Sequence, residues 1–174
     1  ESFPISHSLG YFFEVVSSFI GFSSSHAGKT MGLAGYGRAP EEELFRLTPE
    51  RYDPIASIDV SCGKKQLDEQ SLLYDHWNKE LGRLFGQPNQ RSFSFASNVG
   101  KFLSTTELTE REWKIAALAQ REVERVLLHL VLEFTKKTGF SNLCMAGGVA
   151  LNCSCNGKIV TSGLVGDLFV YPGS

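Results

Sequence analysis

The stretch Asn142–Asn152, Asn-Leu-Cys-Met-Ala-Gly-Gly-Val-Ala-Leu-Asn, combines residue types that suit contact with a nucleotide. Its apolar run and two glycines predict a short strand, a tight turn and the start of a helix. Glycine lets the backbone approach a ligand closely, and a helix start offers free N–H groups and a partial positive charge. Gly147 and Gly148 are therefore candidates for contact with a phosphate or the polar edge of a nucleotide. We place Asn152 about one turn into that helix, within reach of the same ligand, although ordinary strand–helix packing would also explain the glycines.

Two charged residues nearer the beginning of the chain are further candidates for ligand contact. Glu14 is a carboxylate in an expected helix over residues 8–22 that is otherwise rich in aromatic and branched side chains. It either points to solvent or accepts hydrogen bonds from a ligand, for example from ribose hydroxyls. Lys29, within a Gly-Lys-Thr triplet, is either a surface lysine or an anion contact. That triplet is not a Walker P-loop, because Ser23 stands where the motif has an earlier glycine and no apolar strand leads into it.

Apolar periodicity predicts the helices that position these residues. They cover residues 8–22, a short glycine-rich helix within 28–37 that packs closely on a neighbour, residues 73–85 and residues 110–138. The last is the strongest, because Thr109 and Glu112 have the spacing of a capping box and Gly139 suits the position after its C-terminus. At about 1.5 Å per residue it would span roughly 44 Å, enough to cross a whole domain.

The residues of this long helix fall into an apolar and a charged group. The apolar group predicts a buried stripe made of Ile115, Ala119, Val123, Val126, Leu127, Leu130, Val131 and Phe134. We interpret the charged group as a solvent-exposed face that contains Glu110, Arg111, Glu112, Arg121, Glu122, Glu124 and Arg125. Strands are expected at residues 55–60, in the short apolar run that begins at Asn142 and precedes the glycine turn, and at residues 167–171; residues 66–72 are either a strand or a loop. The order helix–strand–helix–strand predicts α/β packing with a parallel strand pair.

Composition bounds the class of protein. A length of 174 residues fits one domain, and 42% hydrophobic with 21% charged residues excludes a disordered chain. A net charge of -2 argues against a general nucleic-acid binder, and no apolar run has membrane-spanning length. The four cysteines, Cys62, Cys144, Cys153 and Cys155, lack the second pair or nearby histidine of a zinc site. We expect buried, reduced thiols in a cytoplasmic protein.

Several segments together resemble the O-carbamoyltransferases of nodulation-factor and antibiotic biosynthesis. The matching blocks are His7-Ser8-Leu9-Gly10 with Gly21-Phe22, then Gly28–Gly37, Ala116–Gln120, and Gly147–Cys153 with Asn156-Gly157-Lys158. Their order and spacing match across nearly the whole chain. Residues 41–108 match poorly, and we expect them to form an irregular insertion within one carbamoyl-transfer domain over residues 1–174.

This resemblance implies an α/β fold, specifically a partial actin/hexokinase/heat-shock ATPase-like (ribonuclease H-like) domain, truncated at both ends and similar to the tRNA threonylcarbamoyl-transfer proteins. It implies a fragment of an ATP-dependent O-carbamoyltransferase. In such enzymes carbamoyl phosphate and ATP give carbamoyl adenylate in a separate domain, and the kinase-like domain transfers the carbamoyl group to a substrate hydroxyl. The Gly-Gly-Val-Ala-Leu-Asn block would lie on the adenosine side. In the tRNA relatives an acidic residue four positions after a helix glycine contacts ribose, and Glu14 follows Gly10 by four.

The resemblance also implies what lies outside this chain. The family's metal ligands belong to a His-rich segment upstream and an acidic block downstream, and Ala27 stands where many members have Glu before the Gly-Lys pair. We expect no metal ion on the fragment, no catalytic residues that can be assigned in it, and no turnover by it alone. The expected nucleotide-binding residues are Gly10, Glu14, Lys29, Gly147, Gly148 and Asn152. The expected partners are a small-molecule hydroxyl acceptor, carbamoyl phosphate, the rest of the parent chain and, through exposed apolar surface, a second copy; nucleic acid and membrane are not expected.

Two other hypotheses stay open at this point. The first is a non-catalytic nucleotide-binding module of the actin-like superfold, favoured by Ala27 and by the metal ligands that lie outside the chain. The second is a structural domain whose glycines serve packing only.

Overall fold

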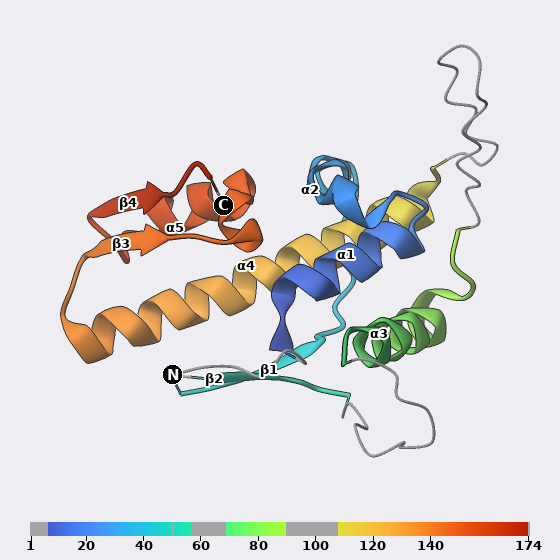
Figure 1. Cartoon of the computed structure of the whole chain (residues 1–174), viewed down its shortest axis with the longest axis horizontal. Coiled ribbons are helices and arrows are strands. Elements are labelled where there is room, and N and C mark those ends of the chain that lie inside the picture. Colours follow the sequence, from blue (N-terminus) through green and yellow to red (C-terminus); the bar gives the residue numbers. More distant parts are fainter. Residues whose placement is uncertain (1–6, 50, 57–68, 90–107, 174) are drawn as a thin grey trace, which may run out of the picture.

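The computed structural model describes residues 7–49, 51–56, 69–89 and 108–173 (Figure 1). The helices are α1 (Leu9–Phe19), α2 (Ala27–Ala34), α3 (Glu69–Phe85), α4 (Glu110–Thr138) and α5 (Cys153–Thr161), with the short 3-10 turns η2 (Ser24–His26) and η3 (Gly148–Leu151). The strands are β1 (Phe45–Thr48), β2 (Arg51–Pro54), β3 (Asn142–Met145) and β4 (Asp167–Val170). β1 and β2 form an antiparallel hairpin, and β3 and β4 pair in parallel. The predicted α/β class and the parallel pair are confirmed.

The long helix α4 crosses the whole molecule, and the other elements lie along it (Figure 1). Its predicted bounds are confirmed, because the local signals at both ends act as expected. At the start, the Thr109 backbone N–H donates to the Glu112 carboxylate at 2.9 Å. At the end, Gly139 adopts a left-handed φ of 69° and its N–H donates to the Thr135 carbonyl.

One apolar core lies where α1, α3 and the β1–β2 hairpin meet the first half of α4. At its centre Phe12 packs against Phe45 and Trp77, with ring centroids 5.3 and 4.6 Å away. All three side chains are at most 1% exposed. α1 fits this core because apolar residues recur on its inner face, while Ser8 caps its start by accepting the Tyr11 N–H at 3.3 Å.

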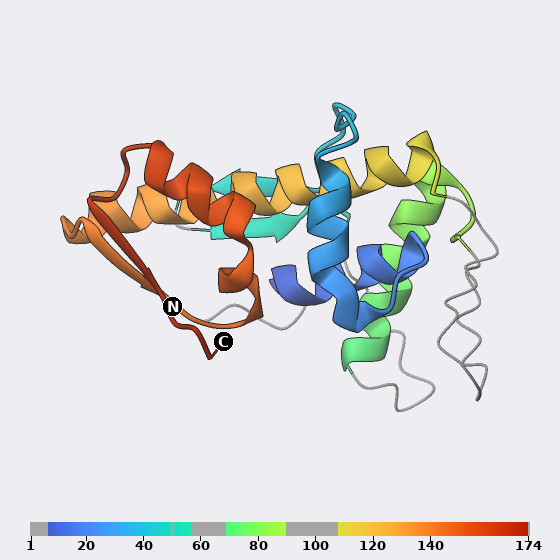
Figure 2. The same ribbon diagram turned by 90° about the horizontal axis from the view of Figure 1, so that it is seen from above.

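The glycine-rich helix α2 packs across α4 as predicted (Figure 2), and at one glycine beside this contact the backbones approach too closely for a side chain. A Cβ on Gly37, just beyond α2, would lie 2.1 Å from the Trp113 carbonyl oxygen, so only glycine fits there. Gly28 and Gly32, within the helix, have no such neighbour within 4 Å.

A second and smaller core lies at the other end of α4, under α5 and the β3–β4 pair. Its buried members are Val131, Cys155, Ile159 and Val165. The outer face of the strand pair is exposed: Phe169 keeps 57% and Tyr171 keeps 55% of its surface in contact with solvent.

The charged group on α4 is largely interior, which makes the prediction of a solvent-exposed face wrong. Glu112, Glu122 and Glu124 are 2%, 0% and 5% exposed. The error arises because α4 is surrounded by other elements at its middle, so that polar positions also face protein. Phe134, by contrast, was expected in the buried stripe and is 49% exposed.

The buried Glu122 carboxylate joins α4 to the segment that leads into the hairpin. It accepts the Leu44 N–H at 2.8 Å, the Phe45 N–H at 3.2 Å and the Arg125 guanidinium at 2.8 Å. Arg121 pairs with the same carboxylate and donates to backbone carbonyls of that segment. Burial by itself would raise the pKa of Glu122, but the hydrogen bonds from Arg125 and the Leu44 N–H outweigh it and lower the pKa.

The region expected to be irregular, residues 41–108, contains regular structure that the sequence did not reveal. The strand pair over residues 45–48 and 51–54 was missed, because its strands are only four residues long and carry few inward side chains. Of the strand expected at residues 55–60, residues 55 and 56 are not in a strand, and 57–60 lie outside the described residues. Residues 69–72 belong to α3 rather than to a strand or loop. Within the described ranges, no helix is both long and apolar enough to cross a membrane.

Candidate functional site

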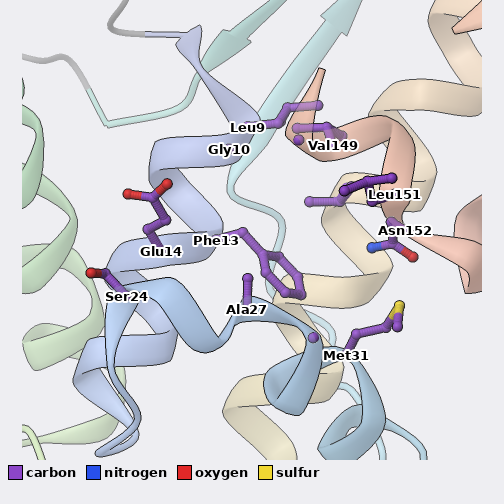
Figure 3. Close-up of a pocket in the computed structure, with 13 residues that line it drawn as sticks. Leu9, Gly10, Phe13, Glu14, Ser24, Ala27, Met31, Val149, Leu151 and Asn152 are labelled. Atoms are coloured by element: carbon purple, nitrogen blue, oxygen red, sulfur yellow. The ribbon is translucent and has the colours of Figure 1, made fainter. Parts of the chain in front are cut away.

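A cavity of about 400 Å³ opens where α1, α2 and η3 approach one another over α4 (Figure 3). It is lined by Leu9, Gly10, Phe13, Glu14, Ser24, Ala27, Gly28, Met31, Val123, Gly148, Val149, Leu151 and Asn152. Most of these groups are apolar. The carboxylate of Glu14 and the carboxamide of Asn152 lie at opposite ends, with Phe13 between them (Figure 3). Such an apolar cavity with a few polar groups at fixed places is typical of a small-molecule site.

Glu14 is placed at this cavity by its position on α1, and it is half-buried. Its carboxylate accepts a hydrogen bond from the Tyr74 hydroxyl of α3 at 3.1 Å. Burial raises the pKa of Tyr74, and the hydrogen bond to the Glu14 carboxylate raises it further, so this hydroxyl stays a donor. Within the described part of the chain Glu14 has no cationic partner, and it lines the cavity with acceptor positions beyond the one that Tyr74 uses.

The glycines give the site its backbone wall. Gly10 lies where α1 meets η3, and a Cβ there would contact the Val149 side chain at 3.6 Å. Gly147 has a φ of 94°, in the region that favours glycine, and it turns the chain from β3 into η3. Gly148 lines the cavity and has no atom within 4 Å of its Cβ direction, so its backbone faces open space.

Asn152 occupies a different place from the one the sequence suggested. The glycine turn leads first into η3, so Asn152 is the residue before α5 rather than one turn inside a helix. Its side-chain oxygen caps α5 by accepting the Cys155 N–H at 3.0 Å. Its carboxamide also forms two hydrogen bonds with the carboxamide of Gln120 on α4, at 2.9 and 3.0 Å. The side chain is therefore held firmly at the cavity edge.

The structure brings Gly10, Glu14, Gly148 and Asn152 together, with Gly147 next to them in the chain. Lys29 is not brought to this cavity: it is exposed and does not line it. The apolar wall from Phe13, Met31 and Leu151 was not anticipated, because apolar residues carry no chemical signal of their own. Gln120 was also missed as a contact of Asn152. A polar residue in the buried part of α4, within a block shared with the carbamoyltransferases, was the signal available.

The thiols differ from the expectation of uniformly buried cysteines. Cys155 is buried, and burial raises its pKa to about 12, with the Glu124 carboxylate adding to the effect. Cys144 and Cys153 are exposed, and Cys62 lies outside the described residues. Among the described side chains, no three His, Cys, Asp or Glu residues come together as metal ligands, so we derive no step through a metal ion.

Comparison with known proteins places the chain in a family. It matches Carbamoyltransferase N-terminus over residues 1–174. It is 29% identical over 180 residues to "Nodulation protein NolO" of Bradyrhizobium diazoefficiens, covering 99% of the chain and 27% of that protein. It is 29% identical over 174 residues to "Nodulation protein NolNO" of Sinorhizobium fredii, covering 99% and 22%. It is 31% identical over 173 residues to "Uncharacterized protein sll1178" of Synechocystis, covering 97% and 25%.

The chain thus spans about a quarter of the length of these curated relatives. The family match covers every residue of the chain, and three of the blocks that carried the resemblance, those that contain Gly10, Gly28 and Gly148, contribute to the walls of the cavity. On these grounds the chain belongs to the carbamoyltransferase N-terminus family.

Proposed function

We propose that this chain is the nucleotide-binding part of an ATP-dependent O-carbamoyltransferase. In the complete protein it holds carbamoyl adenylate while the carbamoyl group passes to a substrate hydroxyl, within a domain of the actin-like ATPase superfold. Family membership supports the transfer chemistry, and the cavity supports the nucleotide. The observation that carries the proposal is the placement of Glu14 and Asn152 at opposite ends of one apolar cavity.

Each part of the cavity suits one part of an adenylate. The apolar side chains of Phe13, Met31 and Leu151 suit a planar base. The Glu14 carboxylate can only accept hydrogen bonds, which suits the two hydroxyls of a ribose. The open backbone at Gly148 suits close approach of a polar group such as a phosphate.

The role of these residues in transfer is to hold the leaving nucleotide. In the reaction the acceptor hydroxyl oxygen bonds to the carbamoyl carbon, and the bond from that carbon to the phosphate oxygen breaks. AMP leaves, and the hydroxyl proton passes to a base. Groups that fix the adenosine keep the reacting carbon in one place, which lowers the entropic part of the barrier. We assign no base among the described residues.

Calorimetric titration of the complete protein with ATP and with a non-hydrolysable carbamoyl adenylate mimic tests the proposal. Glu14→Gln keeps the shape of the side chain and removes its charge, so we expect binding to weaken at least tenfold, about 1.4 kcal/mol. The control is Glu80→Gln on α3, which forms a salt bridge with Arg83 and does not line the cavity, so binding should be unchanged. The site assignment would be contradicted if the folded wild type bound neither compound. It would also be contradicted if Glu14→Gln bound both compounds as tightly as the wild type does.

A non-catalytic nucleotide-binding module is the second candidate function. Ala27 favours it, because this residue lines the cavity at a position where many carbamoyltransferases carry Glu. This candidate predicts the same nucleotide binding without transfer. An assay for carbamoyl transfer to hydroxyl compounds by the complete protein separates the two.

A further inference from the structure

A polar relay of three side chains, Glu124, Gln120 and Asn152, runs from the surface of α4 to the cavity. Glu124 is 5% exposed and accepts hydrogen bonds from Lys158 and from the Ser154 hydroxyl. Gln120 is 6% exposed and donates its amide hydrogens to Glu124 Oε1 at 2.8 Å and to Asn152 Oδ1 at 3.0 Å. Asn152 Nδ2 donates back to Gln120 Oε1 at 2.9 Å.

The chemistry of the relay fixes the direction of every hydrogen bond in it. A carboxylate paired with a lysine can only accept, so the nitrogen of Gln120 must face Glu124. The oxygen of Gln120 then faces Asn152 and requires a donor there. The nitrogen of the Asn152 carboxamide therefore points to Gln120, and the flipped orientation of this carboxamide is excluded.

A second and independent contact demands the same orientation of Asn152. The Cys155 backbone N–H is a donor only, and it points at Asn152 Oδ1 at 3.0 Å. Both acceptor positions of that oxygen are thus in use, by Cys155 and by Gln120. One hydrogen on Nδ2 is used by Gln120, and the other has no partner among the described residues. Figure 3 shows this nitrogen on the side of Phe13 and the oxygen turned away from it.

We propose that Glu124 and Gln120 are positioning residues that hold Asn152 as a hydrogen-bond donor toward the cavity, and that the site thereby selects a purine by one of its ring nitrogens. This inference rests on the proposed nucleotide function. Glu14 at one end of the cavity suits the ribose, so the Asn152 end, beyond Phe13 and beside Met31 and Leu151, receives the base. A base that presents a hydrogen at this point meets a donor and is disfavoured, because two donors cannot pair.

Asn152→Asp is the sharpest substitution, because it changes polarity and little else. Aspartate still caps α5 by accepting the Cys155 N–H. Its second oxygen, however, replaces the donor and faces Gln120 Oε1. Gln120 cannot turn over to relieve this repulsion without directing its own oxygen at the Glu124 carboxylate.

The test is titration of the complete protein with ATP and with three ATP analogues in which a CH group replaces N1, N3 or N7 of the base. In the wild type we expect one analogue to bind at least tenfold more weakly than ATP. In Asn152→Asp that ratio should fall to about one. In Gln120→Met, which leaves Asn152 held only by its cap, the ratio should fall to about threefold or less. The matched control is Asn78→Asp on α3, away from the cavity lining, which should keep the wild-type ratio.

The ratio between analogues separates positioning from stability. A merely structural role for Gln120 would lower the melting temperature or weaken all four ligands equally, and would leave the ratio unchanged. The relay is overturned if the wild type binds all four ligands equally. It is also overturned if the ratio between ATP and the weakest analogue stays the same in both Asn152→Asp and Gln120→Met. Either result leaves the nucleotide site intact. Failure of the folded wild type to bind ATP overturns the proposed function and the relay together. Gln120→Met decides the matter if Asn152→Asp does not fold.

Discussion

The two ends of α4 are packed very differently. At its first half, α1, α3 and the hairpin enclose a core with large aromatic side chains at its centre. At its second half, a few small apolar residues lie beneath α5, and the parallel β3–β4 pair leaves Phe169 and Tyr171 exposed. Parallel strands are ordinarily covered on both faces. The first region therefore holds most of the stability of the described residues, and the second depends on α4. The candidate site takes walls from both.

Removal of an aromatic ring from the first core should have the largest effect on stability. Phe12→Ala deletes a fully buried ring that contacts Phe45 and Trp77, and it should lower the free energy of unfolding by about 4 kcal/mol. Ile159→Ala in the second core should cost less, about 2–3 kcal/mol, because its surroundings can collapse more easily. Urea unfolding measures both, and a larger loss for Ile159→Ala would reverse the ranking of the two regions.

Removal of the Glu122 charge tests how the hairpin is attached to α4. Glu122→Gln leaves Arg121 and Arg125 without their shared carboxylate and weakens the hold on the Leu44 N–H. We expect a loss of about 3 kcal/mol, at the lower end for a buried pair because both arginines are partly exposed. Thermal unfolding would show it, with Glu80→Gln as the control: Glu80 pairs with the exposed Arg83, so its loss should stay within about 0.5 kcal/mol. A loss no larger than that of the control would mean that the carboxylate does not hold the hairpin.

Two glycine substitutions in and just after α2 test how closely this part of the chain approaches α4. Gly37→Ala places a methyl group 2.1 Å from the Trp113 carbonyl oxygen, so the backbone must shift, at a cost of about 2 kcal/mol. Gly32→Ala meets no atom within 4 Å and lies inside the helix, so it should stabilise the protein by up to about 1 kcal/mol. Melting temperatures that move in opposite directions are the expected result. Equal shifts would show that α2 does not approach α4 as described.

Acid should weaken the first region before the second, and this is the smallest effect we expect. The folded-state pKa values of Glu112 and Glu122 lie below the usual 4.5; burial opposes this, and hydrogen bonds outweigh it. The unfolded chain therefore takes up these protons first as the pH falls. The stabilisation is present above about pH 4.5 and is lost as the pH falls through the lowered pKa values. Acid unfolding followed by the fluorescence of Trp77 should show this loss of stability. In Glu122→Gln the loss of stability between neutral and acid pH should be smaller.

Local signals allowed the elements along α4 and beyond it to be predicted from the sequence. The capping box at Thr109 and the left-handed Gly139 gave the bounds of α4, and apolar runs gave β3 and β4. The hairpin and the burial of Glu122 could not be predicted in this way. They depend on contacts between residues far apart in the chain, such as Glu122 with Leu44, which no local pattern records.

The candidate site was predictable to a similar degree. Gly10 was selected by resemblance, Glu14 by local chemistry and by resemblance, Gly148 and Asn152 by local chemistry, and the fold brings these four to one cavity. Lys29 was selected for its place beside a glycine, but its side chain projects from α2 into solvent. The role of Gln120 needed three-dimensional information, because its partner lies 32 residues away. The actin-like superfold stays a prediction.

One turn of α4 holds both regions at once. Glu122 faces the segment before the hairpin, while Gln120 and Glu124, two residues to either side, face the glycine turn and α5. Residues two apart on a helix point in roughly opposite directions, so the contacts lie on opposite sides of the same turn. Opening this turn to solvent requires the contacts of Glu122 on one side and those of Gln120 and Glu124 on the other side to break together. Its amide hydrogens should therefore be among the last in the molecule to exchange with deuterium, and a nucleotide held at Asn152 should slow that exchange further.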